Sequence, residues 1–331
     1  MTEEERSAPK RCLVTGGLGY AGAWISSHLA AQGHEVFVLS RKGERTDIGQ
    51  PYTLIQADLA EQEPGSISAL LPDGLDCVIH AASCNEAFEP SYPRKALAVN
   101  ALGTRNLLQA LVSAHDGAGT VSSLPLVIYL STFHVYGRSS GHILESDLPA
   151  PKNDYALTHY FGEEYCRMMS RLFALPSIVL RISNCYGAPK THDSDKWYLL
   201  LNDLCKKAVI QRALPLQSDP ATLRDFVWMG DLAGIIEKLI YRRDLAGRLF
   251  NLASGKAVSI GEVAGLVAST ASAFLRKKIP VVAEDGNGRA DKGGAPSLLI
   301  SNEALCSALS FSFRDAMREE IVKILDMVVS Q

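Results

Sequence analysis

The chain has 331 residues, of which 47% are hydrophobic and 21% charged, and its formal net charge is −3. This length predicts two domains or one domain with a lobe, and the near-neutral charge argues against a nucleic-acid or anionic-membrane partner. No apolar run approaches the roughly 20 residues of a membrane span, and the start MTEEERSAPKR lacks a secretory signal. The 7 scattered cysteines, without metal-type spacing, predict reduced thiols in a cytoplasmic protein and no metal site.

The first half of the chain alternates short apolar runs with longer amphipathic segments. Residues 11–17 predict a buried strand, and residues 21–33 predict a helix that Gly33 terminates. Further strands are predicted at residues 35–40, 52–59, 76–83, 124–132 and 177–183, with helices at about 94–114 and 154–173. Apolar strands separated by helices predict a doubly wound α/β fold, in which helices cover both faces of a parallel sheet.

The sequence after about residue 184 is less regular. A polar loop, GAPKTHDSDKWY, precedes a predicted helix near residues 197–212. Residues 230–242 are again typical of a helix, and residues 248–254 of a strand. We expect this last third to form a smaller lobe, parts of which return to the sheet.

The stretch TGGLGYAG, residues 15–22, places Gly16, Gly19 and Gly22 between the first strand and the first helix. Glycines at this spacing permit a tight turn and close approach of the backbone to a pyrophosphate, which then faces the free N–H groups of the helix N-terminus. A plain turn is the alternative. The strand before the loop and the helix after it favour a dinucleotide-binding site.

The second predicted strand ends with Ser40, Arg41 and Lys42. NAD sites usually carry an acidic residue here that accepts a ribose hydroxyl, whereas an arginine suits the 2′-phosphate of NADP. We therefore expect NADP to be preferred and NAD to be possible, unless the two basic side chains are only solvated surface charges. Asp58, at the end of the third strand, could bind the adenine amine or simply cap the strand.

Longer motifs follow one another through most of the chain. They are TGGLGYAG (15–22), ADL (57–59), HAAS (80–83), VNALGTRNLLQA (99–110), STFHVYG (131–137), LRISNCYGAP (180–189), RDFVWMGDLA (224–233) and NLASG (251–255), together with Tyr155 and its helix. In these motifs the chain resembles the extended short-chain dehydrogenase/reductases, the NAD(P)-dependent epimerase/dehydratase group that acts largely on nucleotide sugars. The resemblance implies a Rossmann-type domain at 9–183, to which 227–254 return, and a substrate-binding lobe of 184–226 and 255–331.

The resemblance also implies roles for individual residues. Tyr155 would be the acid/base, Thr132 would hydrogen-bond the substrate oxygen, and Asn100 would support the active-site end of a helix. Thr132 could instead be only a strand residue. The implied cofactor contacts are Gly16, Gly19, Tyr20, Gly22, Ser40, Arg41, Lys42, Asp58, Leu59, Ala81, Ala82, Asn100, Tyr155 and His159.

Two further positions match residues that usually contact the nucleotide sugar in this family. They are Asn184 and Arg224, and the planar fork of an arginine is suited to a diphosphate or its ribose. Arg224 could instead pair with an acidic neighbour such as Asp225 or Asp231.

The residues after Thr132 depart from one branch of the family. Sugar 4,6-dehydratases typically carry an Asp–Glu pair there for the elimination of water, and this chain has Phe133 and His134. A standard dehydratase is therefore not expected. His134 would contact the substrate as a second acid or base, or would pack beside the nicotinamide end of the site.

A second departure is His159, which stands four residues after Tyr155 where the family has a lysine. That lysine holds the nicotinamide ribose, and its charge lowers the pKa of the tyrosine; an opposite charge nearby commonly moves a pKa by ~1–3 units. Histidine, with an ordinary pKa of about 6.5, is mostly neutral at pH 7 and can still bind a ribose hydroxyl. Tyr155 then keeps its proton, which favours protonation of a carbonyl during reduction over the start of an alcohol oxidation.

Together these features predict an NAD(P)-dependent enzyme that reduces a keto group of a nucleotide sugar with NADPH, with Thr132, Tyr155 and His159 as catalytic residues. A nucleotide-sugar epimerase with retained NAD is one alternative. A catalytically silent nucleotide-binding or scaffold protein is an alternative of another class. The helices at about 94–114 and 154–173 match those through which the family commonly dimerises, which implies a homodimer.

Overall fold

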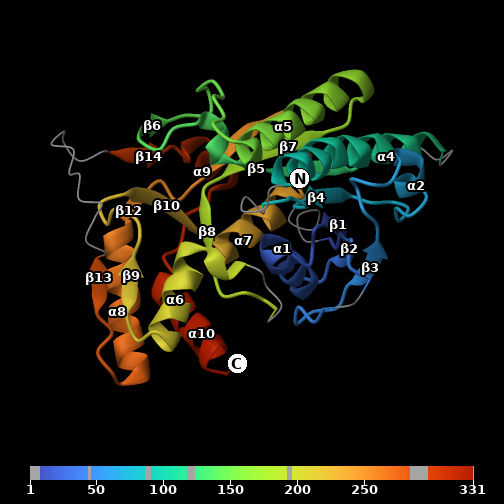
Figure 1. Cartoon of the computed structure of the whole chain (residues 1–331). Coiled ribbons are helices and arrows are strands. Elements are labelled where there is room, and N and C mark those ends of the chain that lie inside the picture. The colour runs from blue at the N-terminus through green and yellow to red at the C-terminus, as the bar shows by residue number, and fades with distance from the viewer. Residues whose placement is uncertain are drawn as a thin grey trace.

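The computed structural model describes residues 8–43, 46–85, 91–117, 124–191, 196–283 and 297–330 (Figure 1). Within these residues the centre is a seven-stranded sheet of order β11-β7-β5-β4-β1-β2-β3. Its strands are β1 (Arg11–Thr15), β2 (Glu35–Ser40), β3 (Thr53–Gln56), β4 (Cys77–His80), β5 (Leu126–Thr132), β7 (Ser177–Ile182) and β11 (Leu249–Leu252). Every neighbouring pair is parallel, which confirms the predicted doubly wound α/β fold.

Helices cover both faces of this sheet. On one face lie α1 (Tyr20–Ala31), α7 (Met229–Leu239) and α9 (Glu303–Leu309), and on the other α2 (Pro64–Ser68), α4 (Thr104–Gly117) and α5 (Asp154–Phe173). Strand β1 serves both cores, because Cys12 and Val14 pack with α1 while Leu13 packs with α4. Successive residues of a strand point to opposite faces, so a strand covered on both sides must be apolar throughout.

The helix predicted at about 94–114 is three consecutive segments. These are α3 (Tyr92–Ala96), a π-helical turn (Leu97–Gly103) and α4. The turn holds Asn100, whose carbonyl accepts a hydrogen bond from Thr104 Oγ1 at 2.6 Å. π-Turns inside α-helices are rare and are often found at functional sites.

The predicted helix 154–173 coincides with α5. Asn153 caps its start by accepting a hydrogen bond from the Ala156 N–H at 2.8 Å, and Ala174 ends it in the left-handed conformation with φ of 55°. Asp154, Tyr155 and His159, which lie in the first two turns of α5, line the cavity described below. The helix therefore presents its N-terminal turns, rather than its middle, to the site.

The remaining elements form smaller sheets and a second apolar core. Helices α6 (Leu200–Ile210), α8 (Ile260–Leu275) and α10 (Met317–Val329) share this core and lie together in Figure 1. The small sheets are β8 (Asn184–Tyr186), β10 (Leu223–Trp228) and β12 (Ala257–Ser259); β9 (Leu214–Leu216) with β13 (Val281–Ala283); and β6 (Gly141–Ile143) with β14 (Leu298–Ile300). That this lobe binds the substrate stays a prediction. Among the described residues, no helix is long and apolar enough to cross a membrane.

Candidate active site

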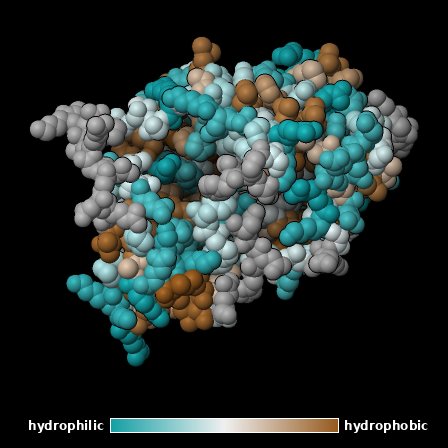
Figure 2. Space-filling model, viewed as in Figure 1, coloured by the Kyte–Doolittle hydropathy of each residue, from teal (hydrophilic) through white to brown (hydrophobic). Residues whose placement is uncertain are grey.

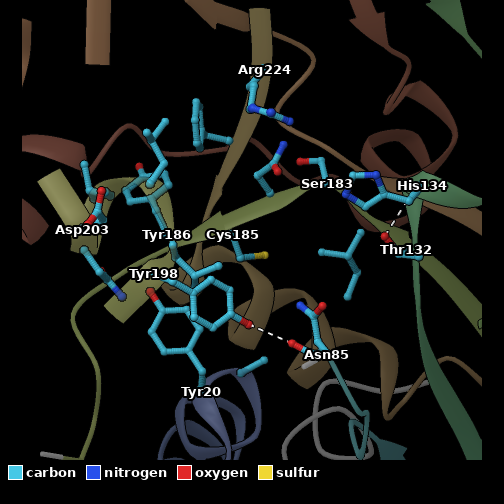
Figure 3. Close-up of a pocket in the computed structure, with 18 of the residues that line it drawn as sticks. Tyr20, Asn85, Thr132, His134, Ser183, Cys185, Tyr186, Tyr198, Asp203 and Arg224 are labelled. Carbon is cyan, nitrogen blue, oxygen red and sulfur yellow. Dashed lines mark hydrogen bonds between the residues drawn. The ribbon is translucent and has the colours of Figure 1, made fainter. Parts of the chain in front are cut away.

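A cavity of about 810 Å³ opens at the carboxyl ends of β5 and β7, next to α6 and β10 (Figure 3). Parallel α/β sheets usually bind their ligands at this edge. In Figure 3, Thr132 and His134 lie on one side of the cavity and Asp203 on the other, with Arg224 at one end. The predicted site residues that line it are Tyr20, Ala81, Thr132, His134, Tyr155, His159, Asn184 and Arg224.

The three glycines of the predicted phosphate loop lie beside the cavity, whereas Tyr20 and Ala21 of the same stretch line its wall. Gly16 has φ of +64°, and a Cβ there would lie 2.7 Å from the Cα of Ala82, so only glycine fits without strain. A Cβ at Gly22 would collide with the backbone of Gly16. Helix α1 begins directly after Gly19, so its N-terminal N–H groups face this bare turn. The loop thus has the shape that a dinucleotide pyrophosphate requires.

Tyr20 ties the phosphate loop to the lobe. Its hydroxyl donates a hydrogen bond to the carbonyl oxygen of Gly187 at 2.5 Å, and Trp24 Nε1 donates to the carbonyl oxygen of Ala188 at 2.9 Å. Tyr20 lines the cavity, and together with Trp24 it fixes Gly187 and Ala188, which follow β8, against α1.

The residues predicted to choose the nucleotide lie at the ends of β2 and β3, outside the cavity. Arg41 and Lys42 are exposed, and Ser40 Oγ accepts a hydrogen bond from the Lys42 N–H at 3.1 Å. Asp58 accepts one from the Ala60 N–H at 2.9 Å, which turns the chain after β3 and agrees with the cap alternative for this residue.

Asn100 joins the loop after β4 to helix α5. Its side-chain oxygen accepts from the Cys84 N–H at 2.7 Å, and its Nδ2 donates to Thr158 Oγ1 at 3.0 Å. Leu59, predicted beside the cofactor, is buried in the core under α4. These residues support the site from behind and do not line the cavity.

Thr132 and Tyr155 meet at the end of β5. Burial raises the pKa of Tyr155 to about 12, and a hydrogen bond with Thr132 partly opposes this rise. The Thr132 Oγ1 also accepts a hydrogen bond from the His134 N–H at 3.3 Å, drawn as a dashed line in Figure 3. At neutral pH the phenol of Tyr155 is therefore protonated and able to donate.

His159 lies next to Tyr155, with 4.6 Å between the ring centroids and the rings nearly perpendicular. Its Nε2 is 3.1 Å from Ser83 Oγ, and its Nδ1 is 3.2 Å from Tyr129 Oη. Burial lowers the pKa of His159 to about 3, with smaller contributions from His80 and His134. The imidazole is neutral at physiological pH, so it gives Tyr155 no positive charge.

The hydroxyl of Tyr129 reaches His159 because residue 162 is a glycine. The Tyr129 hydroxyl donates its proton to the backbone carbonyl of His159 at 3.2 Å. A Cβ at Gly162 would collide with Tyr129 Oη and its ring. Gly162 therefore leaves the space in which Tyr129 and His159 form their hydrogen bond.

A second buried imidazole, His80, belongs to the same polar network. The Thr104 hydroxyl donates its proton to the Asn100 carbonyl at 2.6 Å. Its oxygen can therefore only accept in the second bond, from His80 Nε2–H, 2.9 Å away. His80 Nδ1 then accepts from the Thr15 hydroxyl at 2.6 Å. Burial lowers the pKa of His80 to about 4, so this ring is neutral too. The network links the end of β1, directly before the phosphate loop, to α4.

Behind Thr132, a buried ion pair fixes α5 to the sheet. Arg181 on β7 donates from Nε and Nη2 to Glu163 on α5, at 2.9 and 2.7 Å. Ser131 Oγ donates to the same carboxylate at 2.6 Å. Since removing one partner of a buried pair leaves an uncompensated charge, this contact defines where α5 sits relative to β5.

Arg224 does not pair with either acidic neighbour suggested by the sequence. The Asp225 carboxylate accepts hydrogen bonds from Ser183 and Ser254, and Asp231 accepts from the Arg314 N–H. Within the described residues Arg224 forms no ion pair, and it lines the cavity.

Two other predicted substrate residues lie near it. One is His134, whose pKa is lowered by burial and, to a smaller extent, by the positive charge of Arg224. The other is Asn184, whose Nδ2 donates a hydrogen bond to the backbone carbonyl of Asp225 at 3.0 Å.

Several residues of the site were not found by sequence reasoning. His80 and Ser83 both fall inside the HAAS motif, but the motif alone indicates no role for either. Tyr129 and Gly162 have no local signature, because Tyr129 meets His159, which lies 30 residues further along the chain, and Gly162 matters only through its contact with Tyr129. The sequence signal for these residues is His159 itself. A neutral ring in place of a lysine needs hydrogen-bond partners for its two nitrogens, and Ser83 and Tyr129 are those partners.

Comparison with known proteins shows the family to which the chain belongs. Residues 12–253 match the model of the NAD dependent epimerase/dehydratase family. The chain is 29% identical over 276 residues to GDP-6-deoxy-D-mannose reductase of Pseudomonas aeruginosa, covering 80% of this chain and 82% of that protein. It is 27% identical over 280 residues to UDP-glucose 4-epimerase of Azospirillum brasilense, covering 80% and 78%.

A solved structure, RMD from Pseudomonas aeruginosa complexed with NADPH, superposes with a TM-score of 0.74 at 25% identity and covers 97% of this chain and 99% of that one. The family match spans well over half of the chain and includes both the phosphate loop and Tyr155. The chain therefore belongs to the NAD(P)-dependent epimerase/dehydratase family of the extended short-chain dehydrogenase/reductases.

Proposed function

We propose that the protein reduces a keto group on a nucleotide-linked sugar, with NADPH as the preferred cofactor. The observation that carries this proposal is the neutral environment of the acid/base. The pKa of Tyr155 is raised to about 12, and the neighbouring His159, with its pKa lowered to about 3, brings no charge to oppose that rise. A protonated phenol suits proton delivery and is a poor base for oxidation.

The chain's own residues would bind and protonate the keto oxygen of the substrate. Thr132 and Tyr155 would hold the keto oxygen by hydrogen bonds, and Tyr155 would give it a proton as the carbonyl becomes an alcohol. When bound, the nicotinamide supplies the hydride that the carbonyl carbon receives. His159 would position Tyr155 as a neutral ring packed against it, and its Nε2, which lies 3.1 Å from Ser83 Oγ, would turn to hydrogen-bond the ribose.

The preference for NADPH rests on the end of β2. Ser40, Arg41 and Lys42 supply a hydroxyl and two exposed cations where an acidic residue would serve NAD. A guanidinium binds a phosphate in two-pronged geometry. The likeness to a structure that is complexed with NADPH supports the same choice.

A nucleotide-sugar epimerase is the second candidate, and the likeness to a UDP-glucose 4-epimerase favours it. An epimerase of this kind must both remove and return a hydride, so its acid/base has to work in both directions. Tyr155 with a raised pKa is less suited to the removal step.

The test begins with the nucleotide that copurifies with the recombinant protein, measured by absorbance and mass. Exchangeable NADPH, consumed when a 4-keto-6-deoxy sugar nucleotide is added, would support the reductase. Tightly retained NAD together with conversion of UDP-glucose would support the epimerase and contradict the preference for NADPH. Tyr155→Phe should lower the rate by about 10²–10⁴-fold without lowering the melting temperature, and unchanged turnover would contradict the assignment.

We expect a homodimer formed through α5 and the π-turn before α4. Leu157 and Phe161 lie four residues apart on α5 and are each 38% exposed, and Leu97 and Leu102 are each 45% exposed. Apolar side chains gather over this part of the molecule in Figure 2. Light scattering should give twice the 35.8 kDa of the chain, and Phe161→Glu should return it to one chain.

A further inference from the structure

Tyr92 opens the short helix α3, and its hydroxyl oxygen is buried without a hydrogen-bond partner among the residues that the structure describes. The side chain is only 6% exposed, and it lines the cavity. A buried polar group without a partner costs free energy, and native structures contain few of them. Such a group in the wall of a cavity is explained if a ligand supplies the partner.

The other tyrosines of the cavity show how unusual this is. Tyr20 donates to the Gly187 carbonyl, Tyr186 accepts from the Ala316 N–H, and Tyr198 donates to the Asn85 carbonyl. The fourth, Tyr155, is hydrogen-bonded to Thr132. In the described part of the cavity wall, Tyr92 is the one tyrosine whose hydroxyl is left over.

The position of Tyr92 places this hydroxyl near the reacting end of the site. Its ring packs in a small apolar cluster with Cys84, Ala96 and Tyr155. Burial raises its pKa, and Cys84, Tyr155, Asp154 and Tyr198 are near enough to raise it further. The hydroxyl therefore stays protonated and can donate, so the complementary ligand atom is an acceptor oxygen.

We propose that Tyr92 is a substrate-binding residue whose hydroxyl donates a hydrogen bond to an oxygen substituent of the sugar, close to the carbon at which Tyr155 acts. This assignment rests on the proposed function, because it requires a sugar in the cavity. It has a consequence for specificity. A site built to bond a hydroxyl discriminates strongly against the deoxy compound, since the protein donor is then left unpaired.

The experiment compares the wild type with Tyr92→Phe, which removes only the hydroxyl. Calorimetric titration at saturating NADP⁺ uses three sugar nucleotides, UDP-glucose, dTDP-glucose and GDP-mannose, and the sugar-free diphosphates UDP, dTDP and GDP. For the sugar nucleotide that wild type binds best, the variant should lose about 10- to 100-fold in affinity. The affinity for the matching diphosphate should not change, because it lacks the sugar.

The melting temperature of the free protein separates a ligand role from a structural one. Tyr92→Phe should melt at the same temperature as wild type or higher, since no internal bond is lost. The matched control is Tyr136→Phe, which removes a buried hydroxyl that donates to Asn251 Oδ1 at 2.6 Å and should melt lower.

Equal affinity of wild type and Tyr92→Phe for the sugar nucleotide would overturn the assignment, as would a fall in melting temperature comparable to that of Tyr136→Phe. If wild type itself binds each sugar nucleotide no better than its diphosphate, the proposed function fails and the role of Tyr92 falls with it. The two failures are distinguishable, because only the second appears in the wild type.

Discussion

The two ends of the cavity differ in charge. At the Tyr155 end, a protonated phenol lies beside the neutral ring of His159, and His134 lies near both Tyr155 and Arg224. At the other end Arg224 carries a guanidinium that no described carboxylate neutralises, since Asp225 and Asp231 have other partners. The comparison suggests two tasks: proton delivery where charge is absent, and anion binding where one cation is left free.

The neutral end depends on the space beside Tyr129, and this gives the largest expected effect. Gly162→Ala should destabilise the protein by about 2–4 kcal/mol, because the added methyl group collides with Tyr129 and breaks its bond to His159. Urea unfolding measures the change. The matched control is Gly234→Ala on α7, where a Cβ would meet nothing within 4 Å. Equal stability of the two variants would mean that Tyr129 does not need Gly162.

At the charged end, Arg224→Gln should weaken substrate binding. We expect KM for the sugar nucleotide to rise about 10- to 100-fold with little change in kcat, because a charge-assisted bond to the substrate is lost in the ground state and transition state alike. Steady-state kinetics at saturating NADPH would show it. A fall in kcat with unchanged KM would place Arg224 in the chemical step instead.

The neutral histidines should make the protein sensitive to acid. The pKa of His159 is about 3 in the folded state and ordinarily 6.5, so below pH 6.5 the unfolded chain binds the extra proton and the folded chain does not. Stability is therefore present above this pH and is lost as pH falls from about 6.5 towards 3. Between pH 7 and 5, His159 should account for about 2 kcal/mol of this loss.

His159→Gln removes the titrating group while it keeps a polar side chain. Urea unfolding of wild type and variant at the two pH values should show a smaller loss in the variant. An equal loss in both proteins would mean that His159 is not held neutral by the fold.

The smallest change expected is a shift in pH dependence. His159→Lys would restore a positive charge beside Tyr155 and should lower its pKa by about one unit or more, equivalent to about 1.4 kcal/mol. The upper limb of the pH–rate profile for reduction should move down by the same amount. An unmoved profile would mean that position 159 does not tune Tyr155.

Local pattern was enough for the regular elements. The limits of α5 are as predicted, because Asn153 supplies a cap and the helix is amphipathic over its whole length. The strand predicted at 52–59 ends early, at Gln56, since Asp58 bonds to the Ala60 N–H and turns the chain. The π-turn at 97–103 could not be predicted, because it accompanies the contacts of Asn100 with Cys84 and Thr158.

The same division holds for the candidate site. Motifs pointed to Thr132, Tyr155 and Arg224, and the structure brings all three to one cavity. Tyr92 and Tyr129 could not be predicted from the sequence. The Tyr129 hydroxyl matters because it meets His159, and the Tyr92 hydroxyl matters because no described residue meets it. That is a property of tertiary packing, and no spacing along the chain reports it.

The central claim is that Tyr155 remains a protonated donor because it is buried and its histidine neighbour brings no positive charge. The direct measurement is the ¹³Cζ shift of Tyr155 in tyrosine-labelled protein, assigned by its absence in Tyr155→Phe and followed from pH 6 to about 9.5. A phenol shift that stays constant over this range is the predicted result, since the pKa is about 12. A phenolate shift with a midpoint below about pH 9 would contradict the account.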